Sequence, residues 1–298
     1  MRRRLRTVAS FPVVPPVPVD VVVLGPDDLR PALDLLARVW GLPPGTQFVD
    51  LHMARAFLLA GEPLLGAYRA GAAHDPDALV GASIGFVGTH PGGLHVHSHA
   101  TGIDPALQHA GIGAAMKRSQ RAWALERGIT EIRWTFDPLL ARNAYFNLTK
   151  LGAVGAAYLP DVYGAMGDPV NGTDPSDRVE ARWDLTAPEG RPDPDLDALM
   201  AEGAEVILSL DGEVWRETRL VPTLLACVPS DIVALRASDP GAARQWRMNA
   251  RDSIGRALDL GYGAVGATRD GWWVLQAGAG AAAEAEAGAG GASGNEAE

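Results

Sequence analysis

Residues 103–116 read IDPALQHAGIGAAM, and they join the end of a predicted strand to the start of a predicted amphipathic helix. Gly111 and Gly113 stand at the helix start, where backbone N–H groups lack intrahelical partners and lie at the positive end of the helix dipole. Glycines let a phosphate approach such a main chain closely. The stretch therefore predicts an anion-binding loop at a strand-to-helix turn.

Strands and helices are predicted on both sides of this loop from hydrophobic periodicity and turn residues. The predicted strands are 20–24, 64–68, 79–87, 94–103, 130–136, 153–158 and 179–185. The predicted helices are 26–40, 50–60, 111–126 and 139–151, the last closed by Gly152. The order is β, α, α, β, β, β, α, β, α, β, β.

The loop carries a family signature. Gln108-x-x-Gly111-x-Gly113 resembles the CoA-pyrophosphate motif, Gln/Arg-x-x-Gly-x-Gly/Ala, of the GNAT superfamily of acyl-CoA N-acyltransferases. Ile103 and Pro105 match its strand-end hydrophobic residue and proline, and the element order agrees over about residues 19–186. A Rossmann or P-loop assignment fits less well, because the chain has neither Gly-x-Gly-x-x-Gly nor Gly-Lys-Ser/Thr.

The resemblance implies an α/β fold of GNAT type, a mixed, mostly antiparallel sheet flanked by helices, with acetyl-CoA or another acyl-CoA as co-substrate. The strand over 98–103 would part from the next strand, and one of its N–H groups would stabilise an oxyanion. The residues that the resemblance assigns to the cofactor are Ile103, Gln108, His109, Ala110, Gly111, Ile112, Gly113, Ala114 and Asn143.

The resemblance also implies a base for the attacking amine and an acid for the CoA thiolate. His99 is a candidate base because histidine titrates near neutral pH. Asp137, at the end of the next strand, is a rival base or the N-cap of the helix after Pro138. Many family members have a tyrosine acid four residues before the closing glycine, but Leu148 stands there. Tyr145, one turn earlier, is the remaining candidate.

The acceptor site is predicted along the helix over 139–151 and the long polar loop over 159–178, because long polar loops in compact domains are often functional. Arg178 can pair with a carboxylate of the acceptor or acyl group, or with Asp174 or Asp177. The candidate substrate residues are Tyr163, Asn147, Asn171 and Arg178.

His95, His97 and His99 alternate and share one strand face. Imidazoles suit zinc, but a straight strand separates alternate side chains by about 6.6 Å, so no metal is expected. Cys227, the single cysteine, lies in an apolar run and is predicted to be a core residue. One cysteine excludes a disulfide framework and favours a reducing, cytoplasmic location.

Composition is that of a soluble globular protein, with 298 residues, 47% hydrophobic and 21% charged. No apolar run reaches the roughly 18–20 residues of a membrane helix. The net charge is -10, and four arginines in residues 1–18 balance four glutamates in residues 277–298. An acidic body argues against general nucleic-acid binding, so an anionic ligand needs a local device.

Five segments follow from these patterns. Residues 1–18 are predicted as a disordered arm, 19–186 as the acyltransferase domain, 187–203 as a linker, 204–276 as a small α+β module and 277–298 as a disordered Ala/Gly/Glu tail. The module is predicted as a hairpin over 205–220, a helix over 239–260 with Asp239 as its N-cap, and a hairpin over 262–276. Its helix, Leu-Gly pair and strand echo residues 139–165, which suggests a partial GNAT-like duplication.

The predicted function is transfer of an acyl group, by default acetyl, from acyl-CoA to a small-molecule amine by direct attack in a ternary complex. One alternative is a succinyl- or other acyl-CoA transferase acting on an amino acid. Another is a degenerate acyl-CoA-binding or regulatory protein without transferase activity, which Leu148 favours. The expected partners include no nucleic acid and no membrane, and the expected state is a monomer or homodimer.

Overall fold

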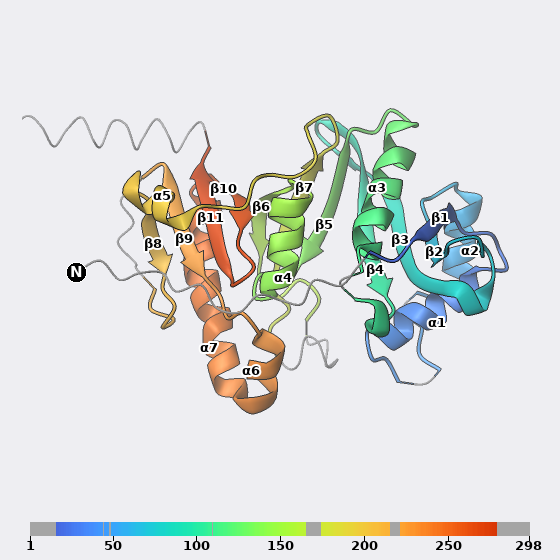
Figure 1. The fold of residues 1–298 in the computed structure, drawn as a ribbon, viewed down its shortest axis with the longest axis horizontal. Helices are drawn as coiled ribbons and strands as arrows, with labels where there is room; N and C mark the ends of the chain where they lie inside the picture. Colours follow the sequence, from blue (N-terminus) through green and yellow to red (C-terminus); the bar gives the residue numbers. More distant parts are fainter. Residues whose placement is uncertain are drawn as a thin grey trace, which may run out of the picture.

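The computed structural model describes residues 16–43, 45–47, 49–108, 110–164, 174–214 and 221–278. Within these ranges eleven strands form one sheet in the order β1-β2-β3-β4-β5-β7-β6-β10-β11-β9-β8 (Figure 1). The strands are β1 Val19–Val23, β2 Leu65–Arg69, β3 Leu79–His90, β4 Gly93–Ile103, β5 Glu131–Phe136, β6 Val154–Leu159, β7 Arg178–Asp184, β8 Glu205–Leu208, β9 Thr223–Cys227, β10 Tyr262–Ala267 and β11 Trp272–Ala277.

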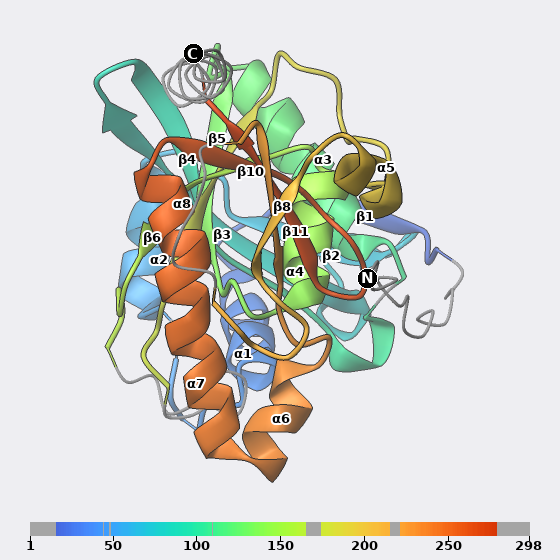
Figure 2. The ribbon, with the colours of Figure 1, turned by 90° about the vertical axis from the view of Figure 1, so that its left-hand side faces the viewer.

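Helices flank the sheet (Figure 2), and two helical segments contain π-helical turns. The α-helices are α1 Leu29–Val39, α2 Leu51–Leu59, α3 Ile112–Leu125, α4 Ala141–Ala144, α5 Leu196–Ala201, α6 Ile232–Ser238, α7 Pro240–Ala250 and α8 Arg256–Asp259. The π-helical turns are η3 Tyr145–Lys150, which continues α4, and η4 Arg251–Gly255, which joins α7 to α8. Short 3₁₀ turns lie at η1 Pro76–Ala78 and η2 Pro105–Leu107.

The predicted fold class is confirmed. Of the paired strands described, β4 with β5 and β8 with β9 run parallel, and the other neighbours run antiparallel. One apolar face of α1 is buried, since Leu29, Leu33 and Leu36 are each at most 2% exposed. The predicted cap of the long C-terminal helix also forms, because Ala242 N–H donates to the Asp239 carboxylate at 2.9 Å.

The C-terminal strands continue the same sheet, because Ala264 of β10 pairs with Gly155 of β6. Read from the opposite edge of the sheet, the C-terminal strands have the order β8-β9-β11-β10, which repeats the order β4-β5-β7-β6. In both sets the first two strands are parallel, β8 to β9 and β4 to β5. We call the part of the chain with β1 to β7 the N-terminal half and the part with β8 to β11 the C-terminal half. In Figure 1 the strands of the two halves lie at opposite ends of one sheet. The partial duplication stays a proposal, and this repeated order supports it.

One core serves both halves of the chain. A single cluster of buried apolar residues joins side chains from β5, α4, β7, α7 and β11. Phe136 of β5 stacks on Trp273 of β11, with ring centroids 5.8 Å apart and planes 13° apart. The residues over 204–276 are therefore packed as part of the sheet domain.

The structure adds detail to three predicted segments. Residues 187–203 contain α5 and pack on η3, since Arg191 donates to the carbonyls of Leu148 and Ala153 at 2.9 Å. The second strand of the hairpin over 205–220 is represented by one bridge, between Leu208 and Val214, because 215–220 lie outside the described residues. The buried segment around Cys227 is β9.

The ends of the predicted terminal segments are part of the fold. Val17 N–H donates to the Ala110 carbonyl at 3.0 Å, and Ala277 N–H donates to the Pro222 carbonyl at 3.0 Å. The rest of both predicted segments, residues 1–15 and 279–298, lies outside the described residues. Among the described helices, none is long and apolar enough to cross a membrane.

Candidate active site

A cavity of about 690 Å³ opens between β4, β5, α3 and α4. It brings together most of the site residues predicted from the sequence. Those that line it are His99, Ile103, Gln108, Gly111, Ile112, Gly113, Ala114, Asp137, Asn143, Asn147 and Arg178. Its lining also holds five cationic side chains, Lys117, Arg118, Arg142, Lys150 and Arg178, against two acidic ones, Asp137 and Glu189. This excess of cationic side chains gives an otherwise acidic protein a local binding site for an anion.

The glycine loop forms one end of the cavity. Gly111 has a φ of +80°, which non-glycine residues rarely adopt, and α3 begins directly after it. A Cβ built on Gly113 would meet no atom within 4 Å, so open space lies beside this backbone at the start of α3. An exposed N-terminal backbone beside cationic side chains fits the pyrophosphate of CoA. Ala110 lies buried behind the loop.

The strands β4 and β5 begin to part at the end of the cavity away from this loop. Their paired residues are Val96 with Ile132 and His97 with Arg133, so the separation starts at Ser98 and Trp134. The register of β3 and β4 shifts there too, because Ile84 pairs with Ala100 and Gly85 with Ser98. His99 is therefore the extra residue of a β-bulge, a feature common beside active sites.

The strand order, the parted β4 and β5 and the glycine loop before α3 are the features that the sequence resemblance implies.

No protein-family model matches the sequence, and none of the curated proteins compared with it matches. Similar solved structures include Naa20 from Chaetomium thermophilum in complex with a bisubstrate analogue, at 18% identity over 59% of this chain and 94% of that chain, with a TM-score of 0.41. YncA from Salmonella typhimurium, with acetyl-CoA, is 17% identical over 59% of this chain and 98% of that chain (TM-score 0.43).

A third similar structure is the ribosomal-protein-S18-alanine N-acetyltransferase from Escherichia coli. It is 14% identical over 59% of this chain and 99% of that chain, with a TM-score of 0.41. Part of this chain therefore has no counterpart in any of the three.

His99 is exposed on β4 and lines the cavity. Its ring lies 6.1 Å from those of Phe86 and His97. Burial lowers its pKa below the ordinary 6.5, which keeps the imidazole neutral and able to accept a proton at neutral pH. Burial and the neighbouring His99 and His95 lower the pKa of His97 further, to about 4.

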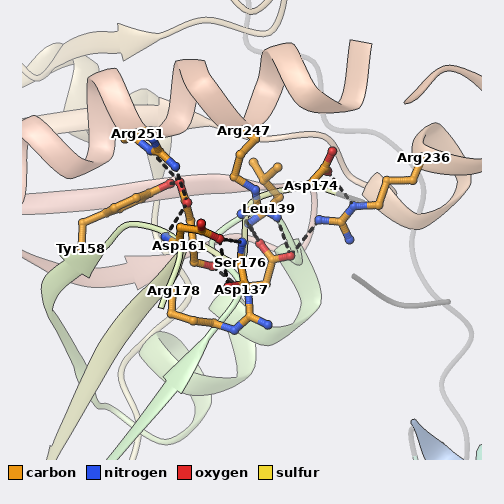
Figure 3. A network of polar contacts seen from close by, with 11 residues as sticks. Asp137, Leu139, Tyr158, Asp161, Asp174, Ser176, Arg178, Arg236, Arg247 and Arg251 are labelled. Carbon is orange, nitrogen blue, oxygen red and sulfur yellow. Dashed lines mark hydrogen bonds and ion pairs between the residues drawn. The ribbon is translucent and has the colours of Figure 1, made fainter. Parts of the chain in front are cut away.

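Asp137 lies at the centre of a buried ion-pair network (Figure 3). Arg247 of α7 binds it through both guanidinium nitrogens at 2.7 and 2.8 Å, and Arg236 of α6 binds it at 2.8 Å. The Leu139 N–H donates to it at 2.8 Å. The helix α4 begins at Ala141 with Leu140 as its N-cap, so Asp137 is not the N-cap considered from the sequence. Burial alone would raise the pKa of Asp137, but the two arginines lower it to about 2. This geometry favours a structural role over that of a base.

A second carboxylate in the same network joins the halves. Asp177 is fully buried and accepts from Arg251 at 2.6 Å and from the Tyr158 hydroxyl at 2.8 Å. Arg236 also binds Asp174, at 3.1 Å. Figure 3 shows these side chains converging from the β5 and β7 region and from the C-terminal helices.

Arg178 is buried at the cavity wall. Its guanidinium donates to the Asp177 carbonyl at 2.9 Å and lies 5.5 Å from the centre of the Tyr163 ring. Tyr163 is 45% exposed and does not line the cavity. Its hydroxyl lies 3.0 Å from the hydroxyl of Thr135. His109 and Asn171, both predicted site residues, lie outside the described residues.

The structure does not bring Tyr145 into the cavity lining. Its hydroxyl donates to Asp193 at 2.8 Å, and the cations of Lys150 and Arg269 lie over its ring. Leu148, at the position of the family's tyrosine, is fully buried. The helix α4–η3 therefore presents no tyrosine hydroxyl to the cavity.

The three alternating histidines, His95, His97 and His99, were considered as metal ligands in the sequence. Among the described residues, no group of three or more His, Cys, Asp or Glu side chains is close enough to hold a metal ion. Cys227 is 2% exposed, as a core residue should be, and burial raises the pKa of its thiol to about 12.

The sequence analysis did not single out Lys117, which is buried where β4 and β5 part. The signal was present, because Lys117 stands beside Met116 on α3 and four residues after Gly113, within the turn expected to face the sheet. It also missed Arg236 and Arg247, whose partner Asp137 is about a hundred residues away in the sequence.

Proposed function

We propose that this protein transfers an acyl group from an acyl-CoA to an amine, with acetyl as the default donor. The observation that carries the proposal is the cavity that starts at the open backbone of Gly113 and ends where β4 and β5 part beside His99. It offers an anion site at one end and a neutral imidazole at the other. A bound acyl-CoA would supply the activated thioester.

The roles of the chain's own residues follow from their positions. The backbone from Gly111 to Ala114, with Arg118 and Arg142 on the cavity wall, would hold the phosphates. His99 would accept the proton that an amine must lose before attack, since free lysine-type amines are mostly protonated at pH 7. Asn143 and Asn147 would orient the cofactor or acceptor by hydrogen bonds.

Arg178 favours a second candidate, a donor or acceptor that carries a carboxylate, such as succinyl-CoA or an amino acid. Its guanidinium lines the cavity in a buried position, where a charge-assisted hydrogen bond is strong. A small-molecule acceptor, a monomer or homodimer without nucleic-acid or membrane partners, and a cytoplasmic location remain proposals from the sequence.

The absence of a tyrosine hydroxyl at Leu148 favours a third candidate, a protein that binds acyl-CoA without transferring the acyl group. Intact-mass analysis separates the three. The protein is mixed with acetyl-CoA or succinyl-CoA and with pooled amino acids and polyamines. The masses of the small-molecule products are then measured by mass spectrometry. An acylated amine supports transfer, whereas CoA binding without any product supports the binding protein.

Gly113→Val tests the cofactor site itself. The added side chain would fill the open space beside the loop and block the approach of phosphate, so we expect CoA affinity to fall at least about 10-fold, or about 1.4 kcal/mol. The free space around Gly113 predicts an unchanged melting temperature. Gly113→Ala, with a single methyl, is the matched control and should lose less. Unchanged affinity of Gly113→Val in calorimetry would remove the assignment of this loop to CoA.

A further inference from the structure

Lys117 is a buried cation on the inner face of α3. It is 6% exposed, its Nζ donates to the Ser98 hydroxyl at 2.8 Å, and the same atom lies 4.0 Å from the centre of the Trp134 ring. None of the ion pairs among the described residues includes it. A lysine is rarely buried without a carboxylate partner, because desolvation disfavours its charged form.

The two contacts place Nζ at the narrow end of the cavity. Ser98 and Trp134 directly follow the last paired residues of β4 and β5, so Nζ lies where the strands begin to part. Ile103, at the glycine-loop end of β4, is five residues further along, which is about 16 Å of strand. A CoA with its phosphates at the loop would extend its pantetheine arm, with two amide units and a terminal sulfur, toward Lys117.

Few other groups at this end can donate a proton. Leu148 has no proton to give, and the Tyr145 hydroxyl is bonded to Asp193 outside the cavity lining. Asp137 is held as a carboxylate by Arg247 and Arg236. Lys150 also lines the cavity but is paired with Asp193 at 3.0 Å. Among the described titratable residues of the lining, arginines and Glu189 aside, this leaves Lys117 and His99. His99 is assigned to the opposite transfer, accepting a proton from the amine.

We propose that Lys117 is the proton donor to the sulfur of the leaving CoA. The inference rests on the proposed function. As the amine nitrogen bonds to the acyl carbon, the carbon–sulfur bond breaks and its electron pair stays on sulfur. The Lys117 ammonium gives that sulfur a proton and becomes a neutral amine, and it regains a proton from water. The acceptor ammonium loses two protons, one before attack and one as the amide forms. Both leave through His99 to solvent, and since one proton returns to Lys117, each turnover releases one proton.

The electrostatic surroundings suit this role. Burial lowers the pKa of Lys117 from 10.5 to about 7, where an acid is both partly protonated and willing to donate. The helix α3 packs against β1 to β5. The titratable and charged groups on these elements are Asp20, Tyr68, Arg69, His90, His95, His97, His99, Glu131 and Arg133, with Arg118 and Arg121 on α3 itself. Of these, His97 is electrostatically coupled to Lys117.

The first test needs no acceptor and no turnover. CoA is bound to the full-length protein, and the apparent thiol pKa is read from the ultraviolet absorbance of its thiolate. We expect the bound thiol pKa to lie at least about one unit below that of free CoA, because an ammonium at the sulfur favours the thiolate. Lys117→Met, an unbranched apolar replacement, should abolish this depression.

Two further variants sharpen the reading. Lys117→Arg should keep the thiol pKa lowered, because the guanidinium remains charged at every relevant pH. Arg127→Met removes another cation that lies over a tryptophan, Trp123, at the far end of α3, and should leave the bound thiol as in the wild type. Melting temperatures no lower than the wild type show that the variants are folded.

The second test uses any acceptor found by the intact-mass assay. Lys117→Met and Lys117→Arg should both lower kcat about 100-fold or more with little change in the KM for acyl-CoA. Both should lose the fall in kcat at high pH that deprotonation of Lys117 causes in the wild type.

The outcomes separate the two proposals. If the wild type does not bind CoA, the proposed function is overturned and the role of Lys117 falls with it. If CoA binds but its thiol pKa is the same in the wild type and in Lys117→Met, only the role of Lys117 is overturned. The same holds if the mass assay shows Lys117 itself acylated, since it would then act as a nucleophile.

Discussion

Asp137→Asn is expected to lower the free energy of unfolding by about 3–5 kcal/mol, because it leaves the buried guanidinium of Arg247 without its counter-charge. Arg247 is 1% exposed and has both of its terminal nitrogens on Asp137. Arg236 loses a partner in the same substitution. Chemical denaturation at neutral pH, with midpoint and slope compared between variant and wild type, measures the effect.

Two controls show whether burial of the pair is the cause. Asp193→Asn breaks the exposed pair with Lys150 and should change stability by about 1 kcal/mol or less. Asp137→Leu combined with Arg247→Met replaces both buried charges by apolar groups and should recover much of the loss. A wild-type midpoint for Asp137→Asn would show that the pair adds nothing to stability.

The same pair predicts an acid limb in stability. The pKa of Asp137 is about 2 in the folded protein against an ordinary 3.8, so the folded state binds fewer protons between these values. Its contribution is fully present above about pH 4 and is lost as the pH falls toward 2. Asp137→Asn should flatten this part of the stability profile.

His99→Gln is expected to lower kcat at least about 100-fold, because glutamine keeps a polar side chain but cannot accept a proton near neutral pH. CoA affinity should stay nearly intact, since the glycine loop is untouched. A neutral imidazole is required, so wild-type activity should fall as the pH drops through the pKa of His99. Burial places that limb below pH 6.5, and the variant should lack it.

His95→Gln, on the same strand but outside the cavity lining, is the matched control and should keep both the rate and the acid limb. If His99→Gln instead keeps near-normal kcat and the limb, His99 is structural. A chain of water molecules would then be the better candidate for the base, since Asp137 is held by two arginines.

The parts of the fold predicted well are those whose causes are local. The glycine loop, the end of β4 and the start of α3 follow from residues within one strand-to-helix turn. The cap at Asp239 likewise needs only the next turn of helix. Such signals are set by hydrogen bonds between near neighbours, so a single sequence reveals them.

The parts that were not predicted depend on distant contacts. No sequence pattern near Asp137 predicts its contact with Arg247, and none near Tyr145 predicts its contact with Asp193. The prolines of residues 187–203 predict a linker, yet Arg191 in this segment donates a hydrogen bond to the Leu148 carbonyl of η3. Lys117 is a different case, because a single lysine on an amphipathic helix is usually solvated.

The sharing of one core and one ion-pair network by both halves has a consequence for synthesis on the ribosome. Asp137 and Arg247 are separated by 110 residues, and β6 has no neighbour on its outer edge until β10 has been made. At 5–20 residues per second the delay is roughly 5–20 s. During that interval the nascent chain carries an open sheet edge and a carboxylate awaiting its partner, so binding by a chaperone would be most useful there.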